Sequence, residues 1–375
     1  MPRILHIINQ LAPCGAEILL LNVLKYSNRK EFDYHIMLPY GEDELDYRAR
    51  DMGVELHHLG GAKVGSRKLL GEGIEKIKSL KPDLINTHTR FSDMVGLYGG
   101  KVAGVKKRMM TVHQCGMYFL ESKPFYRGVM EYFVVRYACH FVAVSKSVKE
   151  YVIKYGNIRD DRITVIYNGI DLEIWRKEPE SDRSTIRKSF GLSDSDYVVA
   201  APARLFPEKG FDHLIREFDV FSKKRQNAKL VICGFGPCEN NLKNLVKRFN
   251  LENRILFLGN IPNLQELFKA SDCFALSSRK EGFGLAFVEA MASGLPVIGS
   301  NVGAIPELIS HEKDGLIFNI RIPGDLVKAL DRIYSDKTLA ESLGNAGKKK
   351  ALEQFDVAFA SKKYEELYRK ILGLN

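Results

Sequence analysis

Two glutamates, Glu281 and Glu289, stand eight residues apart, the first in a glycine loop and the second in the helix expected to follow it. The loop Glu-Gly-Phe-Gly at 281–284 lets the backbone turn tightly, and a helix start offers free N–H groups with a partial positive charge. Either glutamate alone would be read as a solvated surface residue. As a pair they favour a ligand rich in hydroxyl groups, because carboxylates are strong hydrogen-bond acceptors.

Two cations, Arg204 and Lys209, follow an apolar run at 198–201. At the carboxyl end of a strand they could neutralise a diphosphate, the arginine through a bidentate fork and the lysine as a point charge. The same pair would stabilise the negative charge that grows on a diphosphate leaving group. From position alone, two surface cations beside a helix start explain the pattern equally well.

Small and polar residues mark further strand ends in the first half of the chain. Gly15 and Ala16 open a helix after the first strand, where a phosphate could touch the backbone, although a plain turn is the simpler reading. His88 and His113 each follow an apolar run, and a neutral imidazole there can hydrogen-bond a sugar hydroxyl.

Short apolar runs alternate with helical patterns along both halves of the chain, which predicts two α/β domains with parallel sheets covered on both faces. In such sheets, ligands bind beyond the carboxyl ends of the strands. Strands are expected at 4–8, 34–38, 55–59, 83–87, 109–112, 141–144 and 163–167, and then at 198–201, 229–233, 255–258, 273–276, 297–298 and 316–318.

The chain of 375 residues is too long for one ordinary core. We predict a first domain over 1–172, a polar linker over 173–195 and a second domain over 196–355. In the simplest arrangement the two doubly wound domains face each other across a cleft. The segment 356–375 is expected to be a helix with an apolar stripe of Tyr364, Leu367 and Tyr368.

The composition, with 45% apolar and 27% charged residues, is that of a globular protein. The apolar runs are too short for a signal peptide or a bilayer span, so we expect a cytoplasmic protein, at most peripheral on the inner face of the membrane. None of the six cysteines forms a Cys-x-x-Cys pair, which argues against zinc and disulfides.

The formal net charge of +10 favours anionic partners such as sugar-nucleotide diphosphates, anionic lipids or nucleic acid. Residues 117–141 mix aromatic and cationic side chains, which suits docking on anionic lipid as well as a buried helix with a cationic solvent face. The cations do not gather on one arm or helix, so no nucleic acid is expected as a partner.

Several motifs, in the right order over essentially the whole chain, resemble those of retaining glycosyltransferases of family four. The segment 281–289 resembles their Glu-x7-Glu signature, and Ala-Arg-Leu at 203–205 with Lys-Gly at 209–210 resembles their phosphate motif, with alanine in place of its leading glycine. Cys-Gly-Ala-Glu at 14–17 resembles their Gly-Gly-Ala-Glu turn with the first glycine replaced. Further matches are Thr-Val-His at 111–113, Val-Ser at 144–145 and Asn-Gly-Ile-Asp at 168–171.

The resemblance implies a GT-B fold, a nucleotide-sugar donor in the cleft, no cofactor and no obligatory metal. It also implies that the last helix crosses back to the first domain. Carried over, Arg204 and Lys209 clamp the diphosphate, Glu289 holds the ribose and Glu281 holds the donor sugar. The resemblance also implies contacts between the donor and the backbone of Gly15, Ala16, Phe283, Gly284 and Leu285. His113 is expected to contact the donor sugar. His88 and Ser145 are expected on the acceptor side.

The expected reaction is transfer of a sugar, with retained anomeric configuration, to a glycan or lipid-linked acceptor. UDP is the expected donor base, because it is the commoner one in the family. A GT-B sugar-nucleotide epimerase and a non-enzymatic binder of polyanions or membranes are the alternatives.

Overall fold

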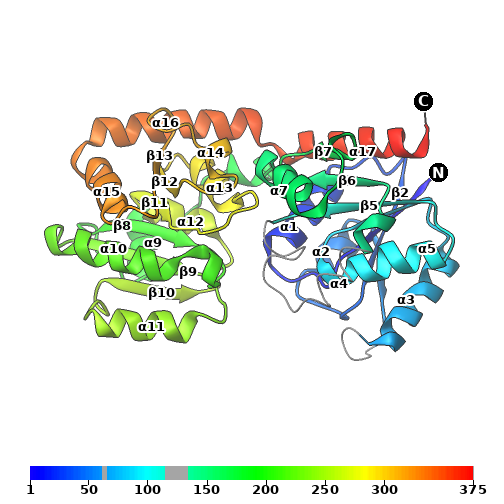
Figure 1. The fold of residues 1–375 in the computed structure, drawn as a ribbon. Helices are drawn as coiled ribbons and strands as arrows, with labels where there is room; N and C mark the ends of the chain where they lie inside the picture. Colours follow the sequence, from blue (N-terminus) through cyan, green and yellow to red (C-terminus); the bar gives the residue numbers. More distant parts are fainter. Residues whose placement is uncertain (61–65, 115–133, 375) are drawn as a thin grey trace. The chain divides into compact units, whose positions relative to one another are not determined.

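The computed structural model describes residues 1–60, 66–114 and 134–374 (Figure 1). The chain divides into two compact units, and the C-terminal segment belongs to the first. Unit 1 comprises Met1–Gly169 and Val357–Asn375, and unit 2 comprises Ile170–Asp356. Within the described residues, every helix is too short or too polar to cross a lipid bilayer.

Unit 1 is built on a seven-stranded parallel sheet with the strand order β3-β2-β1-β4-β5-β6-β7. The strands are β1 Arg3–Ile7, β2 Asp33–Leu38, β3 Glu55–His58, β4 Leu84–Thr87, β5 Lys107–Val112, β6 His140–Ala143 and β7 Ile163–Val165. The helical elements are α1 Gly15–Lys25, α2 Asp46–Asp51, α3 Arg67–Leu80, α4 Arg90–Asp93, the π-helix η1 Met94–Gly99, α5 Gly100–Val102, η2 Val135–Tyr137, α7 Lys146–Gly156, η3 Asp160–Arg162 and α17 Val357–Leu372.

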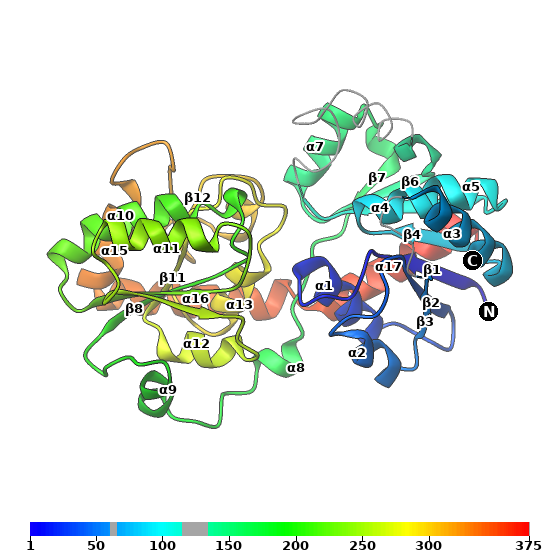
Figure 2. The same cartoon turned by 90° about the horizontal axis from the view of Figure 1, so that it is seen from below.

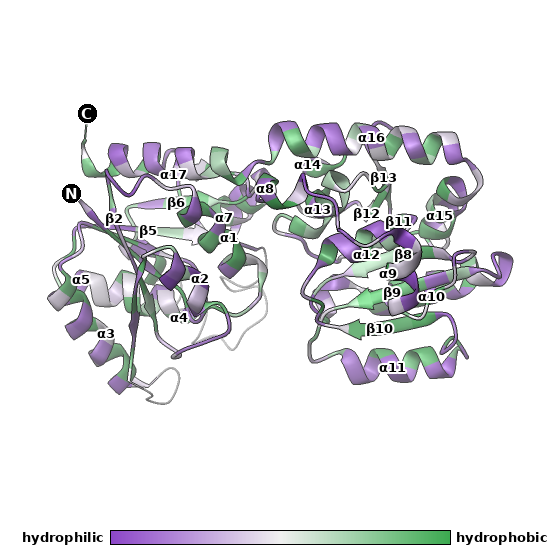
Figure 3. Ribbon diagram, turned by 180° about the vertical axis from the view of Figure 1, so that it is seen from behind, coloured by the Kyte–Doolittle hydropathy of each residue, from purple (hydrophilic) through white to green (hydrophobic). Residues whose placement is uncertain are grey.

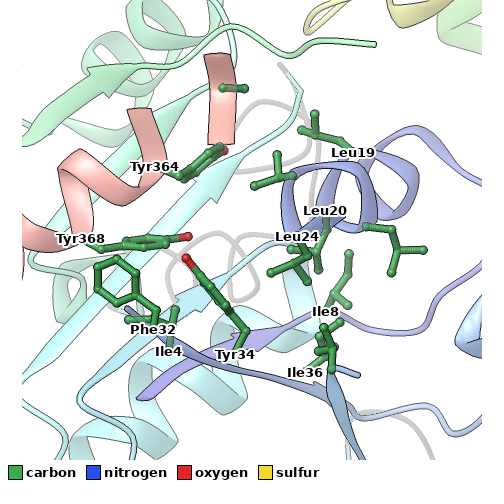
Figure 4. Close-up of a cluster of buried hydrophobic side chains, with 14 of the residues drawn as sticks. Ile4, Ile8, Leu19, Leu20, Leu24, Phe32, Tyr34, Ile36, Tyr364 and Tyr368 are labelled. Carbon is green, nitrogen blue, oxygen red and sulfur yellow. The ribbon is translucent and has the colours of Figure 1, made fainter. Parts of the chain in front are cut away.

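Alternate residues of the strands in unit 1 face opposite sides of the sheet and build two separate cores. Ile4 and Ile36 point to the side covered by α1 and α17, whereas Leu5 and Met37 point to the side covered by α3 and η1. Figure 4 shows the first core, in which leucines of α1 and the tyrosines of α17 enclose the ring of Tyr34.

The C-terminal helix α17 is fastened to unit 1 by polar contacts as well as by its buried tyrosines. The Glu365 carboxylate accepts a hydrogen bond from the backbone N–H of Asn28 at 2.5 Å. Arg369 forms two hydrogen bonds with the Glu31 carboxylate, at 2.6 and 2.5 Å. These contacts join segments more than 330 residues apart in the sequence, so α17 is part of the first core.

Unit 2 contains a six-stranded parallel sheet with the order β10-β9-β8-β11-β12-β13. Its strands are β8 Tyr197–Pro202, β9 Ala228–Cys233, β10 Ile255–Gly259, β11 Cys273–Leu276, β12 Val297–Ser300 and β13 Leu316–Phe318. Its helical elements are α8 Leu172–Trp175, α9 Arg183–Ser189, η4 Pro207–Lys209, α10 Phe211–Lys224, α11 Glu239–Arg248, α12 Leu264–Ala270, α13 Leu285–Ala292, α14 Ile305–Leu308, α15 Asp325–Ser335 and α16 Lys337–Gln354.

Helices cover both faces of the sheet in unit 2. Helices α10, α11 and α15 lie on one face, and α9 and α12 lie on the other (Figure 2). Strands β8, β9 and β11 are mainly apolar and buried, with Lys229 of β9 as a charged exception. Figure 3 shows β9 mainly hydrophobic where α11 carries a hydrophilic stretch. This burial on both faces is what the near-continuous apolar runs of these strands predict.

The segment expected as a linker, 173–195, is instead folded into unit 2. It contains most of α8 and all of α9, and α9 packs against α12. Arg187 of α9 is only 3% exposed, and its guanidinium bonds the Asp272 carboxylate at 2.9 Å. The same guanidinium donates to the backbone carbonyls of Ala270, Ser193, Asp194 and Asp196. The hydrogen bonds of one buried cation thus hold this segment, which has few apolar residues, against the rest of unit 2.

We predict that Arg187→Met lowers the free energy of unfolding by about 3 kcal/mol or more, because it removes the buried partner of Asp272 and leaves several carbonyls without this donor. Arg183 pairs with the same carboxylate at 2.5 Å but is 43% exposed, so Arg183→Met is the matched control. It should cost less than about 1 kcal/mol. Urea unfolding of both variants measures the difference, and equal losses would contradict the organising role of Arg187.

Candidate active site

A glycine loop joins the end of β11 to the start of α13 and gives the site its shape. Gly284 is the residue before the helix and has a φ of +97°, in the left-handed region that side chains other than glycine rarely adopt. The first amides of α13, beginning with Leu285, have no acceptor within the helix. Phe283 is buried and packs edge-on against Phe355. The loop therefore presents backbone donors on a rigid base.

Glu281 is held in place through both its side chain and its backbone. Its carboxylate forms an ion pair with Lys209, whose Nζ lies 2.7 Å from Oε2, and accepts a hydrogen bond from the Ser278 hydroxyl at 3.2 Å. Its carbonyl oxygen accepts from the N–H of Ala304 at 3.1 Å. Gly303 packs so closely on this carbonyl that a Cβ there would lie 2.1 Å from the oxygen.

The segment after β8 is tied to the loop after β11, which brings Lys209 to Glu281. Gly210 lies directly against the carbonyl oxygen of Ser277, where a Cβ would approach to 1.9 Å. Arg279 binds the Asp212 carboxylate through two hydrogen bonds of 2.7 Å and donates its backbone N–H to the carbonyl of Glu208. The two neighbouring strand ends thus form one structural unit.

Arg204 differs from Lys209 in its surroundings. Its guanidinium lies over the ring of Phe206, 4.9 Å from the centroid, and the side chain is partly exposed. Among the residues that the structure describes, no carboxylate pairs with it. Its charge therefore stays available to an anionic ligand, and the aromatic ring limits the directions in which it can point.

Glu289 lies in α13 and is partly buried. Burial raises the pKa of its carboxyl group to about 7, because removal from water disfavours the charged form. A ligand hydroxyl that donates to this group would favour the carboxylate, so binding at Glu289 is coupled to loss of a proton near neutral pH.

In unit 1, the predicted residues His88 and His113 lie side by side just beyond β4 and β5. The Nδ1 atom of His88 is 3.2 Å from Nε2 of His113. Gly15 and Ala16 form the first turn of α1. The hydroxyl of Ser145 accepts from the N–H of Val148 and is fully buried, so Ser145 caps α7.

The structure thus brings Lys209 and Glu281 together within unit 2 and the two histidines together within unit 1. Sequence reasoning missed three contacts at these sites: the ion pair between Lys209 and Glu281, the support from Ser278, and a third histidine, His6, on β1 next to His88. The alternation of β1 was the available signal, because it puts a polar His6 on the same face as Ile4 and Ile8. Most of the aromatic and basic stretch 117–141 lies outside the described residues.

Two clusters of histidines and carboxylates offer metal-ligand atoms, and both involve β3, at the edge of the sheet of unit 1. One joins His35, Glu55 and His57, and the other joins Glu42, Asp46 and His58. In the first, the two rings already share a 2.8 Å hydrogen bond, and the pKa of His57 is lowered to about 4 by burial and the nearby charge of Lys76. The positive charge of Lys76 also opposes a metal cation at this first cluster. In the second, the Asp46 carboxylate is already engaged by His58 at 2.7 Å.

Two family models match the chain, one in each unit. The model described as "Glycosyltransferase Family 4" matches residues 13–174, and the one described as "Glycosyl transferases group 1" matches residues 182–350. Together they cover most of the chain. The chain belongs to glycosyltransferase family 4 and has the GT-B fold.

Individual relatives agree with this assignment. An uncharacterized glycosyltransferase of Methanocaldococcus jannaschii is 33% identical over 68% of this chain and 65% of its own length, so this chain spans slightly less than two thirds of that relative. An Escherichia coli protein named UDP-Gal:alpha-D-GlcNAc-diphosphoundecaprenol alpha-1,3-galactosyltransferase is 29% identical over 78% of this chain and 76% of its own.

A solved structure shares the fold over nearly the whole chain. The crystal structure of Anabaena Alr3699/HepE in complex with UDP and glucose has a TM-score of 0.85 and 23% identity to this protein. The match covers 99% of this chain and all of that chain.

We predict that the raised pKa of Glu289 makes the protein less stable as the pH rises from about 4.5 to about 7, since the folded state keeps a proton that the unfolded state has lost. Glu289→Gln removes this dependence, so its stability relative to the wild type should increase over that range by about 2–3 kcal/mol. Urea unfolding at pH 5 and pH 8 measures both proteins. A constant difference would show that Glu289 titrates normally.

Proposed function

We propose that this glycosyltransferase moves a sugar from a UDP-sugar to a hydroxyl acceptor with retention of anomeric configuration, and that no metal ion takes part. The acceptor is a growing cell-surface glycan or glycolipid. The observation that carries the proposal is the arrangement in unit 2. Arg204, which pairs with no carboxylate in the described part of the chain, and the ion pair of Lys209 and Glu281 lie beyond neighbouring strand ends, and α13, which starts beside them, carries Glu289.

Each of these groups has a chemical role in the proposal. Arg204 and Lys209 bind the diphosphate, and the first amides of α13 share its charge. Glu281 accepts hydrogen bonds from the hydroxyls of the donor sugar, and Glu289 accepts from the ribose. Gly15 of unit 1 touches the diphosphate, and His113 contacts the sugar near its anomeric carbon.

The proposed reaction is a displacement on one face of the sugar. The bond between the anomeric carbon and the diphosphate oxygen breaks, and the acceptor oxygen bonds to that carbon from the same side. The acceptor's proton passes to the leaving phosphate oxygen, so the products are the glycoside and UDP. Because the phosphate takes the proton, the pair of flanking carboxylates that a glycosidase uses is not needed.

The choice of donor and acceptor is supported by the relatives. The E. coli protein is named for UDP-galactose and a diphosphoundecaprenol acceptor, and the Anabaena structure contains UDP. The basic and aromatic residues of 117–141 and the net charge of +10 suit an acceptor at an anionic membrane surface, to which the protein would bind peripherally.

We predict that Arg204→Ala and Lys209→Ala each reduce turnover more than tenfold, because each removes positive charge facing the leaving diphosphate. Lys243→Ala is the matched control, since Lys243 belongs to the same unit but pairs with Glu239 on the exposed face of α11. Steady-state release of UDP with the identified donor provides the measurement. Turnover as high as the control's would remove the residue concerned from the site.

The stereochemical outcome is a separate test. A thermal-shift screen of UDP-, GDP- and ADP-sugars first identifies the donor, because a ligand that binds only the folded state raises its stability. The anomeric proton coupling in the NMR spectrum of the product then gives the configuration. We expect the configuration of the donor, whereas an inverted product would exclude the same-face displacement. Conversion of the donor without an acceptor would indicate an epimerase.

A further inference from the structure

The imidazole rings of His6, His88 and His113 form a continuous row of hydrogen-bonded side chains in unit 1, the histidine file. His6 belongs to β1, and His88 and His113 follow β4 and β5 directly. Nδ1 of His6 is 2.9 Å from Nε2 of His88, and Nδ1 of His88 is 3.2 Å from Nε2 of His113. The ring centroids are 5.2 and 5.4 Å apart. Two hydrogen bonds therefore join the three rings end to end.

All three rings are neutral near pH 7. Burial lowers the pKa of His6 to about 3 and that of His113 to about 4. The pKa of His88 is also well below its ordinary value, because of burial and of its two histidine neighbours. Each ring therefore carries one N–H and one bare nitrogen, and each hydrogen bond in the file needs one of each.

These conditions allow only two arrangements of the protons. If Nδ1 of His6 carries its proton, it donates to His88, His88 donates to His113, and Nδ1 of His113 carries the last proton. If Nε2 of His6 carries it, every hydrogen bond reverses and Nδ1 of His113 is bare. The nitrogen of His113 that carries the proton is therefore determined by His6, which is connected to it through the ring of His88.

The surroundings of His6 favour the first arrangement. Its Nε2 is buried and has no hydrogen-bond partner in the part of the chain that the structure describes. A cavity of about 10 Å³, enough for one water, lies here between the file, the apolar face of α1 and two tyrosines of α17. Its lining residues are His6, Leu19, Leu20, Val23, His88, Tyr364 and Tyr368. Among these, the hydroxyl oxygen of Tyr368 already accepts a hydrogen bond from Nδ2 of Asn86 at 3.4 Å. Its own proton can therefore point into the cavity, either at a bare Nε2 of His6 or at a water that in turn donates to this nitrogen.

The other end of the file is His113, which the proposed function assigns to the donor sugar. Nδ1 of His113 is also buried and has no partner among the described residues. A buried N–H without an acceptor is rare and costly, so its presence here points to a ligand atom as the missing acceptor.

We propose that His6 and His88 are positioning residues that hold His113 as the Nδ1–H tautomer, so that His113 donates a hydrogen bond to a hydroxyl oxygen of the donor sugar. The part of this inference that concerns the sugar rests on the proposed function. The part that concerns the tautomer does not, because it follows from the three rings and the cavity alone.

Nitrogen-15 NMR of the histidine-labelled protein, without any substrate, tests the tautomer. Two-bond nitrogen–proton correlations distinguish Nδ1–H from Nε2–H, and we expect His6, His88 and His113 all to be Nδ1–H at pH 7. His6→Leu removes the first donor and should convert His113 to a mixture of tautomers. His6→Asn, whose amide N–H₂ can replace the Nδ1 donor, should restore the wild-type form. Nε2–H at His113 in the wild type, or no change in His6→Leu, would overturn the inference.

Turnover provides the second readout. His6→Leu should lower kcat/KM for the donor about tenfold, the equivalent of one lost hydrogen bond, and His6→Asn should recover most of it. Thermal unfolding confirms that both variants fold. If the tautomer shifts as expected but no donor sugar is transferred even by the wild type, the proposed function fails and the coupling of the rings stands. A shifted tautomer with unchanged kcat/KM would overturn the role of the file in catalysis.

Discussion

The ion pair between Lys209 and Glu281 is the contact on which the site in unit 2 depends. Its two partners come from different strand ends, and both are largely buried, with 16% and 8% of their side chains exposed. A buried charge without a partner is strongly unfavourable, so each residue offsets the free-energy cost of burying the other's charge. The pair therefore fixes the distance between Lys209 and Glu281, which in the proposed function bind the diphosphate and the donor sugar.

In the proposed donor complex, this pairing would also couple the diphosphate and the sugar of the donor. A lysine ammonium has three N–H groups and can bind a phosphate oxygen while it keeps Glu281. The Glu281 oxygen Oε2 is already engaged by Lys209 and Ser278, and this leaves the other oxygen for the sugar. The close packing of Gly210 on Ser277 and of Gly303 on Glu281 gives this arrangement little room to shift. Preorganised charge of this kind is what stabilises a leaving diphosphate.

The strands were the part of the fold that could be predicted most closely from the sequence. The bounds 273–276 and 316–318 agree with β11 and β13, because strands buried on both faces leave short apolar runs between polar turns. The segment 173–195 was wrongly expected to be a linker, since α9 is anchored by the polar contacts of Arg187 and not by an apolar stripe. No helix was predicted over 90–102, where α4, the π-helix η1 and α5 lie, because Gly96, Gly99 and Gly100 are poor helix formers.

The chemistry of the candidate site could be predicted only at the level of residue types and strand ends. Parallel strands end at a common edge, so the positions of His88, His113, Arg204 and Glu281 after apolar runs placed them on the correct edges. Which side chains touch depends on rotamers and on packing from distant segments. Thus His6 joins His88 only because α1 and α17 close over the same face of the sheet and bury both rings. Tyr364 and Tyr368, which cover His6, belong to the last helix, more than 350 residues from β1 in the sequence. The sequence around His6 therefore could not predict their contact with it.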